Sequence, residues 1–168
     1  MIDCRPASSD DARILAQTRQ RVWQETYRGI YPDSMLDDYD INYYENRDRA
    51  KILDANHHYY LYFDAEQCVG YFSFGPYNYG TYRDFQLCLN NLYITKSYRG
   101  CGLGKHAFSV IQMFCQKHHI KKFFCGCNAN NLPAIEFYRH MGGVQGDDAL
   151  PHVPKADQII HFEFYIGE

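Results

Sequence analysis

The sequence has no apolar run of about 18 residues, the length at which a helix can cross a bilayer. Residues 1–5 include Asp3 and Arg5 and so lack the apolar segment of a signal peptide. The net charge is only −3, so neither sign dominates as it does in proteins with a general affinity for nucleic acid or anionic membranes. These absences predict a cytoplasmic protein that has neither a membrane nor a nucleic acid as its partner.

Internal repeats, low-complexity tracts and linker-like segments are also absent. Hydrophobic residues make up 46% of the chain and aromatic residues 17%, a composition that excludes disorder as the main state. A chain of 168 residues can bury a substantial core. We therefore expect one domain that spans residues 1–168.

Paired cysteine motifs are missing. The seven cysteines are odd in number and scattered, which indicates reduced thiols rather than a disulfide framework. Cys125 and Cys127 are closer in sequence than the C-x2-C pairs of zinc sites, so we expect buried apolar side chains and no metal. Cys101 differs because it lies in a glycine-rich turn before a helix, where a thiol can be reactive.

That turn is the most informative stretch of the chain. Over residues 92–105 an apolar strand pattern is followed by a basic, glycine-rich turn and then directly by a helical pattern. Glycines at 100, 102 and 104 permit unusual backbone conformations and close approach of a ligand. The free N–H groups at a helix N-terminus bind phosphate, and Arg99 and Lys105 add positive charge. The spacing matches neither a P-loop nor a dinucleotide fingerprint, which leaves another kind of phosphate turn or a plain glycine-rich turn.

The strand before the turn changes its alternation. Phe85, Leu87 and Leu89 occupy odd positions, whereas Leu92 and Ile94 occupy even ones. An inserted residue is needed to change the face that a strand buries, so the pattern predicts a β-bulge near Asn90 and Asn91. The alternative is a strand that ends at Leu89 and restarts.

Two signatures in this half of the chain resemble those of a known family. Arg99-Gly100-Cys101-Gly102-Leu103-Gly104 fits R/Q-x-x-G-x-G/A, and residues 131–142 fit N-x-x-A-x-x-F-Y-x-x-x-G. Leu92-Tyr93-Ile94 fits the L-Y-V segment that precedes the first signature. The chain thus resembles the GNAT superfamily of N-acetyltransferases. A W-x-x-x-Y-x-G-I-x-P pattern, from Trp23 to Pro32, is similar to the first-helix region of small-amine members such as polyamine acetyltransferases.

The resemblance implies a mixed α/β (α+β) fold. Its central sheet is mostly antiparallel, one parallel pair of strands splays apart, and helices flank the sheet. The periodicities agree with this order of elements. Strands are predicted at residues 1–5, 59–63, 68–74, 84–94, 122–127, 144–149 and 158–166, with a loop at 150–157, and helices at residues 12–27, 32–39, 41–55, 103–119 and 131–141. In the third of these helices, Tyr44, Ala50 and Leu53 are expected to face inward.

The resemblance also implies a cosubstrate, acetyl-CoA, and a direct attack of an amine on its thioester. Tyr138 matches the family tyrosine that protonates the departing thiolate, although a core aromatic would suit the same helix. Asn131 matches the asparagine that contacts the cofactor, and a helix cap explains it equally well. Ile94 is the expected source of the N–H for the oxyanion. The residues expected at the cofactor are Leu92, Tyr93, Ile94, Arg99, Gly100, Cys101, Gly102, Leu103, Gly104, Lys105, Asn131, Ala134 and Tyr138.

This chain lacks the general base that many members of the family have. Many relatives have Glu just before the L-Y-V segment, where this chain has Asn90-Asn91, and an amide cannot accept a proton near neutral pH. A base elsewhere, a water relay or an amine of low pKa must supply about 4 kcal/mol. Asp84 and His58 are weak candidates for this base. A CoA-binding module without activity is the alternative function.

The acceptor is expected to be a small or exposed primary amine. Tyr27, Tyr31 and Tyr77 are candidates for its binding wall. Acids around Tyr39 favour a polyamine, and aminoglycosides, amino acids and protein N-termini stay open. The resemblance also allows a homodimer.

Overall fold

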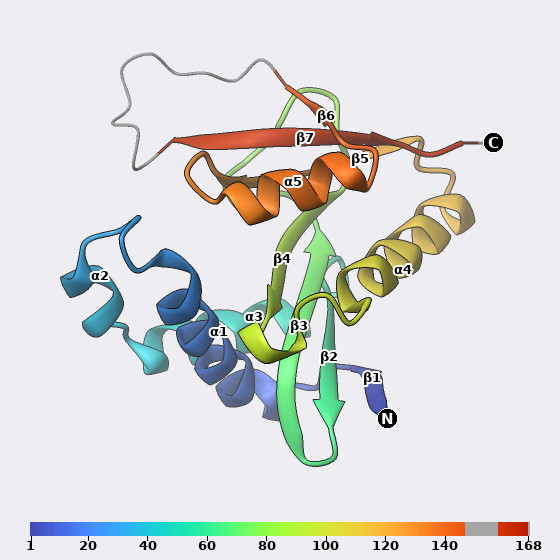
Figure 1. Ribbon diagram of the computed structural model, residues 1–168. Coiled ribbons are helices and arrows are strands. Elements are labelled where there is room, and N and C mark those ends of the chain that lie inside the picture. The colour runs from blue at the N-terminus through green and yellow to red at the C-terminus, as the bar shows by residue number, and fades with distance from the viewer. Residues whose placement is uncertain (147–157, 168) are drawn as a thin grey trace.

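The structure is a computed structural model in which residues 1–146 and 158–167 are described. These residues form a seven-stranded sheet in the order β1-β2-β3-β4-β5-β7-β6 (Figure 1). Its strands are β1 (Ile2–Pro6), β2 (His58–Asp64), β3 (Gln67–Gly75), β4 (Cys88–Ile94), β5 (Lys122–Asn128), β6 (Val144–Gln145) and β7 (Ile159–Tyr165). The α-helices are α1 (Ala12–Tyr27), α2 (Asp33–Asp37), α3 (Ile41–Leu53), α4 (Leu103–Lys117) and α5 (Leu132–His140), with short 3-10 turns at Ser9–Asp11 and Lys96–Tyr98. All neighbouring strands are antiparallel except β4 and β5, as the sequence predicts.

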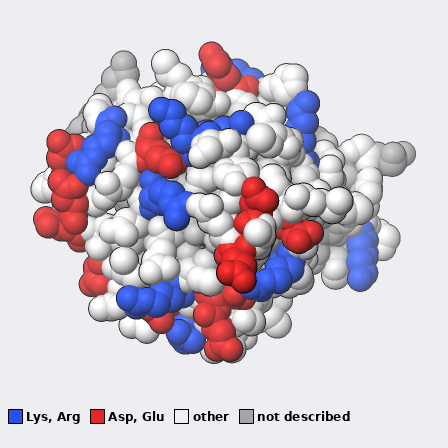
Figure 2. Space-filling view, turned by 60° about the horizontal axis from the view of Figure 1, so that its bottom comes forward, with Lys and Arg blue, Asp and Glu red and all other residues white. Residues whose placement is uncertain are grey.

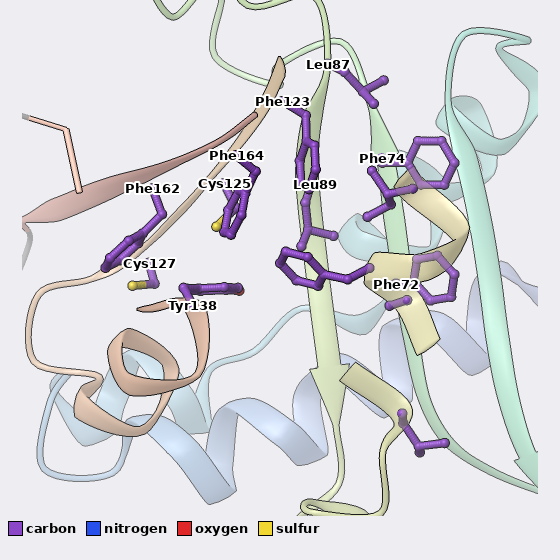
Figure 3. Close-up of a cluster of buried hydrophobic side chains, with 14 of the residues drawn as sticks. Phe72, Phe74, Leu87, Leu89, Phe123, Cys125, Cys127, Tyr138, Phe162 and Phe164 are labelled. Carbon is purple, nitrogen blue, oxygen red and sulfur yellow. The ribbon is translucent and has the colours of Figure 1, made fainter. Parts of the chain in front are cut away.

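Helices cover both faces of the sheet. On one face α4 and α5 pack on aromatic strand residues, among them Phe72, Phe123 and Phe164, which Figure 3 shows in the buried cluster. On the other face Leu15 of α1 packs on Leu61 and Tyr71. Period-2 alternation of large apolar residues along β2 and β3 sends side chains to both layers, which explains why this part of the sheet is buried on both faces.

The parallel strands β4 and β5 pair only briefly. Their register holds two residue pairs, Cys88 with Phe124 and Leu89 with Cys125, whereas β5 and β7 form seven. Beyond Leu89 the two strands diverge. The predicted splay is therefore present, and it opens the sheet beside the glycine-rich turn.

The predicted bulge is also confirmed. Ser73 of β3 pairs with Asn91, and the next residue, Phe74, pairs with Leu89, so Asn90 is the extra residue. The insertion keeps Leu89 and Leu92 in the same core cluster, although they are an odd number of residues apart.

β4 is shorter than predicted, because it begins at Cys88 rather than at residue 84. Residues 76–87 form a loop whose rings pack on β5: Tyr77, Tyr82 and Phe85 all contact Phe124. The apolar alternation of Phe85, Leu87 and Leu89, which suggested a strand from residue 84, therefore begins in the loop and only its last member lies in β4. β6 is Val144–Gln145, and the remainder of the predicted strand at 147–149 and the loop at 150–157 lie outside the described residues.

The predicted inward face of α3 is wrong at two of three positions. Tyr44 is half-buried, but Ala50 is exposed and Leu53 is 72% exposed. The buried residue is Asp48, whose Oδ2 lies 2.8 Å from Nη1 of the buried Arg19 of α1. A sequence pattern assigns charged residues to the surface, whereas here two opposite charges pair inside.

A pH-dependent contact holds β1 to the start of α1. Asp11 accepts hydrogen bonds from Arg5 Nη2 (2.7 Å) and Ser8 N (2.7 Å), and the Arg5 guanidinium lowers the pKa of Asp11 to about 2. A depressed carboxyl pKa stabilises the fold above pH 3.8, and this stability is lost as the pH falls through about 2.

Asp11→Asn should therefore lower the free energy of unfolding by roughly 1–2 kcal/mol at pH 7, an amount reduced by the exposure of Arg5. Urea unfolding at pH 7 and at low pH would measure this, and the difference from wild type should shrink toward pH 2. The exposed neighbour Asp10 provides a control, since Asp10→Asn should have little effect. An equal loss for both variants would contradict the assigned role of Asp11.

Candidate active site

A cleft of about 480 Å³ passes through the sheet where β4 and β5 diverge. Residues of α1 line it on one side of the sheet and residues of α4 and α5 on the other. Its lining residues are Val22, Thr26, Tyr27, Leu89, Asn90, Asn91, Leu92, Tyr93, Ile94, Arg99, Gly100, Gly102, Gly104, Lys105, Gly126, Cys127, Asn131, Pro133, Ala134, Phe137 and Tyr138. The structure thus brings most of the predicted cofactor residues to one cavity.

The glycine-rich turn lies at this cleft and leads into α4. Gly100 and Gly102 have φ values of +80° and +85°, a left-handed conformation that side chains disfavour, and Gly102 is the N-cap of α4. Gly104 must lack a side chain for a different reason, because a Cβ there would lie 2.7 Å from the ring of Phe137 on α5. The first N–H groups of α4, together with the exposed Lys105, make this end of the cleft suited to an anion.

Arg99 braces the turn against α1 and β4. Its Nη2 donates to Thr26 Oγ1 (2.9 Å) and its Nε to the Ile94 carbonyl (3.0 Å). Glu25 accepts from the backbone N–H of Lys96 (2.7 Å) and lies 3.6 Å from the Arg99 guanidinium. The guanidinium predicted to bind phosphate therefore also holds the turn in place.

The edge of β4 directs backbone polar groups into the cleft. The N–H of Thr95 donates to Val69 of β3 (3.0 Å), just beyond the pair Gly70 and Ile94. In an antiparallel ladder this places the N–H of Ile94 on the side away from β3. The side away from β3 is where β5 has diverged, so the Ile94 amide is available to a ligand between the strands.

Tyr138 lies in the gap between the strands. It is 7% exposed, its ring packs on Phe162 at a centroid distance of 5.7 Å, and its hydroxyl is within hydrogen-bonding reach of Cys125 (Figure 3). Burial raises the pKa of Tyr138, so the phenol stays protonated at neutral pH. It can therefore donate a proton.

Tyr27 of α1 lines the other side of the cleft, and Tyr31 of the following loop packs against it. Burial raises the pKa of Tyr27, and the amide of Asn131 lies within hydrogen-bonding reach of its hydroxyl. Asn131 also caps α5 by accepting from Ala134 N (3.4 Å). The ring of Tyr31 is tilted against that of Tyr27 at a centroid distance of 5.0 Å, and its hydroxyl accepts from Asn128 Nδ2 of β5 (3.1 Å). These contacts join α1 to the end of β5 across the open part of the sheet.

Four predicted site residues do not line this cleft: Cys101, Leu103, Tyr31 and Tyr77. Cys101 borders a second, smaller hollow, together with Cys4 and His106. Leu103 is buried in the core between α4 and the sheet. Tyr31 packs against Tyr27, and Tyr77 packs on Phe124.

The lining residues include no carboxylate. Asn90 uses its amide to hold the loop before β4, donating to Pro76 O (2.9 Å) and accepting from Asn78 N (3.3 Å). Asn91 is buried and donates to Ser73 Oγ (2.6 Å). The two weak candidates, Asp84 and His58, are not among the lining residues either.

Sequence reasoning missed several lining residues. Val22 and Thr26 share the face of α1 with Tyr27, so their helical spacing was a usable signal. Phe137 is the Phe of the second signature and so also had a signal, whereas Gly126, Cys127 and Pro133 had none, because they reach the cleft only through the divergence of β5 and the position of α5.

Acidic and basic side chains are interspersed on the face drawn in Figure 2. Many are paired, as Arg13 is with Glu45 (2.8 Å) and Arg28 with Asp33 (2.9 Å). Within residues 1–146 and 158–167, no helix is long and apolar enough to cross a membrane, and no group of three or more metal-ligating side chains is present. All seven cysteines are free thiols.

Comparison with known proteins agrees with this geometry. The model of the acetyltransferase (GNAT) family matches residues 17–142. The fold is similar to a PaiA N-acetyltransferase from Thermoplasma acidophilum in complex with coenzyme A, with 17% identity, a TM-score of 0.81, and coverage of 98% of this chain and 99% of that chain. A comparison with curated proteins found no match.

Two further solved structures show the same fold. A possible acetyltransferase from Clostridium difficile 630 has 20% identity and a TM-score of 0.69, over 92% of this chain and 97% of that one. The ribosomal-protein-S18-alanine N-acetyltransferase from Escherichia coli has 13% identity and a TM-score of 0.67, over 100% and 96%. Because the family model spans well over half of its length, this chain belongs to the GNAT family of acetyltransferases.

Proposed function

We propose that this protein transfers the acetyl group of acetyl-CoA to a primary amine by direct attack within a ternary complex. The observation that carries the proposal is the cleft through the sheet, which has an anion-binding turn beside it and Tyr138 between its diverging strands. A cleft open to both faces allows a donor and an acceptor to meet from opposite sides.

The residues present fit the donor. The N-terminus of α4 and Lys105 would hold its diphosphate, while the left-handed Gly100 and Gly102 leave the backbone uncovered, with no atom near a hypothetical Cβ. The β4 edge would pair with the amide groups of the pantetheine arm. The donor supplies the activated acyl group, and the Ile94 N–H would stabilise the oxyanion.

Tyr138 would supply the proton for the departing thiolate. Its hydroxyl is protonated and lies among buried residues that exclude water. Such a donor in a dry site typically accelerates a reaction by about 10²–10⁴-fold.

For the acceptor we propose a small or exposed primary amine, rather than a nucleic acid or a membrane component. Two of the three acids that favoured a polyamine have partners within the protein: Asp37 pairs with Arg28, and Asp40 caps α3 by accepting from Tyr43 N. We also propose a cytoplasmic location and allow for a homodimer.

Release of free thiol from acetyl-CoA, measured over a panel of amines, tests this function. The panel should contain polyamines, aminoglycosides, amino acids and a peptide with a free N-terminal alanine, since one structural neighbour is named for an alanine of a ribosomal protein. Calorimetric titration with acetyl-CoA runs alongside. Binding together with turnover supports the proposal, binding without turnover indicates the inactive module, and no binding contradicts both.

A further inference from the structure

Gly126 makes a gap in the cleft wall. It lies in the middle of β5, yet it is exposed and lines the cleft. A Cβ on Gly126 would lie 2.9 Å from Cγ2 of Ile159, and 3.2 Å from Cδ2 and 3.3 Å from Nε2 of His161, its partner on β7. His161 is not itself a lining residue, but because Gly126 has no side chain, the edge of the imidazole and the Ile159 methyl group lie next to the backbone that lines the cleft.

The groups around His161 hold its ring in this position. The ring packs on that of Tyr82 with a centroid distance of 4.3 Å and a tilt of 32°, and Nε2 lies 3.4 Å from the Tyr77 hydroxyl. Both tyrosines belong to the loop before β4. The nearest carboxylate along β7 is Glu163, which is paired with Arg83 (2.8 Å) and accepts from Tyr82 (3.4 Å). On the β5 side the ring meets Phe124, which does not titrate.

Gly126 and His161 lie on the face of the sheet that is opposite to α4 and α5. Gly126 alternates with Cys125 and Cys127, which belong to the cluster under α4 and α5, so His161 lies on the opposite face. Asn128 on that same face donates to Tyr31, which connects it to the α1 side of the cleft. His161 therefore lies on the acceptor side, across the sheet from the turn that would hold the donor.

We infer that His161 is the proton acceptor for the amine, an inference that rests on the proposed function. The ammonium form of the acceptor would give one proton to the imidazole. The freed lone pair forms the C–N bond as the C–S bond breaks, and Tyr138 gives its proton to the thiolate. The proton left on the new amide nitrogen restores the Tyr138 hydroxyl, and His161 releases the first proton to solvent. Histidine is the side chain that most often serves as a general base in enzymes.

His161→Gln tests the inference, because glutamine retains a polar side chain of similar size but cannot take up the proton. We expect kcat at pH 7 to fall about 100-fold with unchanged acetyl-CoA affinity, and the acidic limb of the pH profile of kcat/KM to disappear. The loss should be largest for amines of high pKa and small for amines of low pKa, which are already deprotonated. Gly126→Ala, which fills the gap, should reduce kcat in the same direction. His140→Gln, an exposed histidine at the end of α5, is the matched control.

The outcomes are separable. If wild type acetylates no amine, the proposed function fails and the role of His161 falls with it. If wild type is active and His161→Gln loses activity equally for all amines with an unchanged pH profile, His161 is only structural and the inference is overturned. Activity of His161→Gln equal to wild type would overturn it as well.

Discussion

Replacing Tyr138 with phenylalanine should lower kcat by about 100-fold or more and leave the affinity for acetyl-CoA nearly unchanged. The substitution removes only the hydroxyl, so the ring still packs against Phe108, Phe162 and Phe164. Because burial holds the pKa of Tyr138 above its ordinary value, the phenol is a proton donor over the whole neutral range. Its loss should therefore slow the departure of the thiolate and not the binding of the donor.

Steady-state kinetics by thiol release and calorimetry with acetyl-CoA would measure the two effects separately. Tyr59→Phe is a matched control, since Tyr59 is also buried but packs in the α1 layer on the other face of the sheet. It should retain wild-type kcat. Unchanged turnover in Tyr138→Phe would reject the proton-donor role and leave Tyr138 as a core aromatic.

Gly102→Val is expected to weaken acetyl-CoA binding by 100-fold or more, on the order of 3 kcal/mol. Gly102 has a φ of +85° and is the N-cap of α4, a conformation that a β-branched residue adopts only with strain. Relief of that strain would redirect the first N–H groups of α4, which are the groups proposed to hold the diphosphate. The side chain would also cover backbone that is now open.

Gly142→Val separates this effect from general strain. Gly142 has the same φ of +85° and equally open surroundings, but it follows α5 and does not line the cleft. Thermal unfolding should show a similar loss of stability in both variants, whereas calorimetry should show lost binding only in Gly102→Val. A Gly102→Val protein that binds acetyl-CoA normally would remove the turn from the proposed site.

Gly104, in the same turn, has a packing role rather than a conformational one. Its spacing with Gly100 and Gly102 suggested a shared role in phosphate binding. Its φ is not positive, and the missing side chain makes room for Phe137 of α5. The contact joins two helices that are far apart in sequence, so no local pattern could have revealed it.

The bulge and the glycine-rich turn were accessible from the chain alone because each leaves a local trace. Alternation that changes parity at Asn90, glycines at fixed spacing and a capped helix at Asn131 are properties of a few consecutive residues. The splay of the parallel strands and the role expected of Tyr138 came instead from the resemblance of two signatures to the GNAT family. The element boundaries were less accurate, as β4 shows.

What depended on the tertiary structure was the meeting of residues from separate elements. The buried pair of Arg19 and Asp48 joins α1 to α3, and His161 lies next to the cleft residue Gly126 only because β7 pairs with β5 opposite this glycine. Periodicity reports which face of an element is apolar, but it carries no information about which charge or imidazole another element will bring to that face. Local sequence therefore specified the glycine-rich turn and the helix that carries Tyr138, and long-range packing decided which groups from other elements surround the cleft.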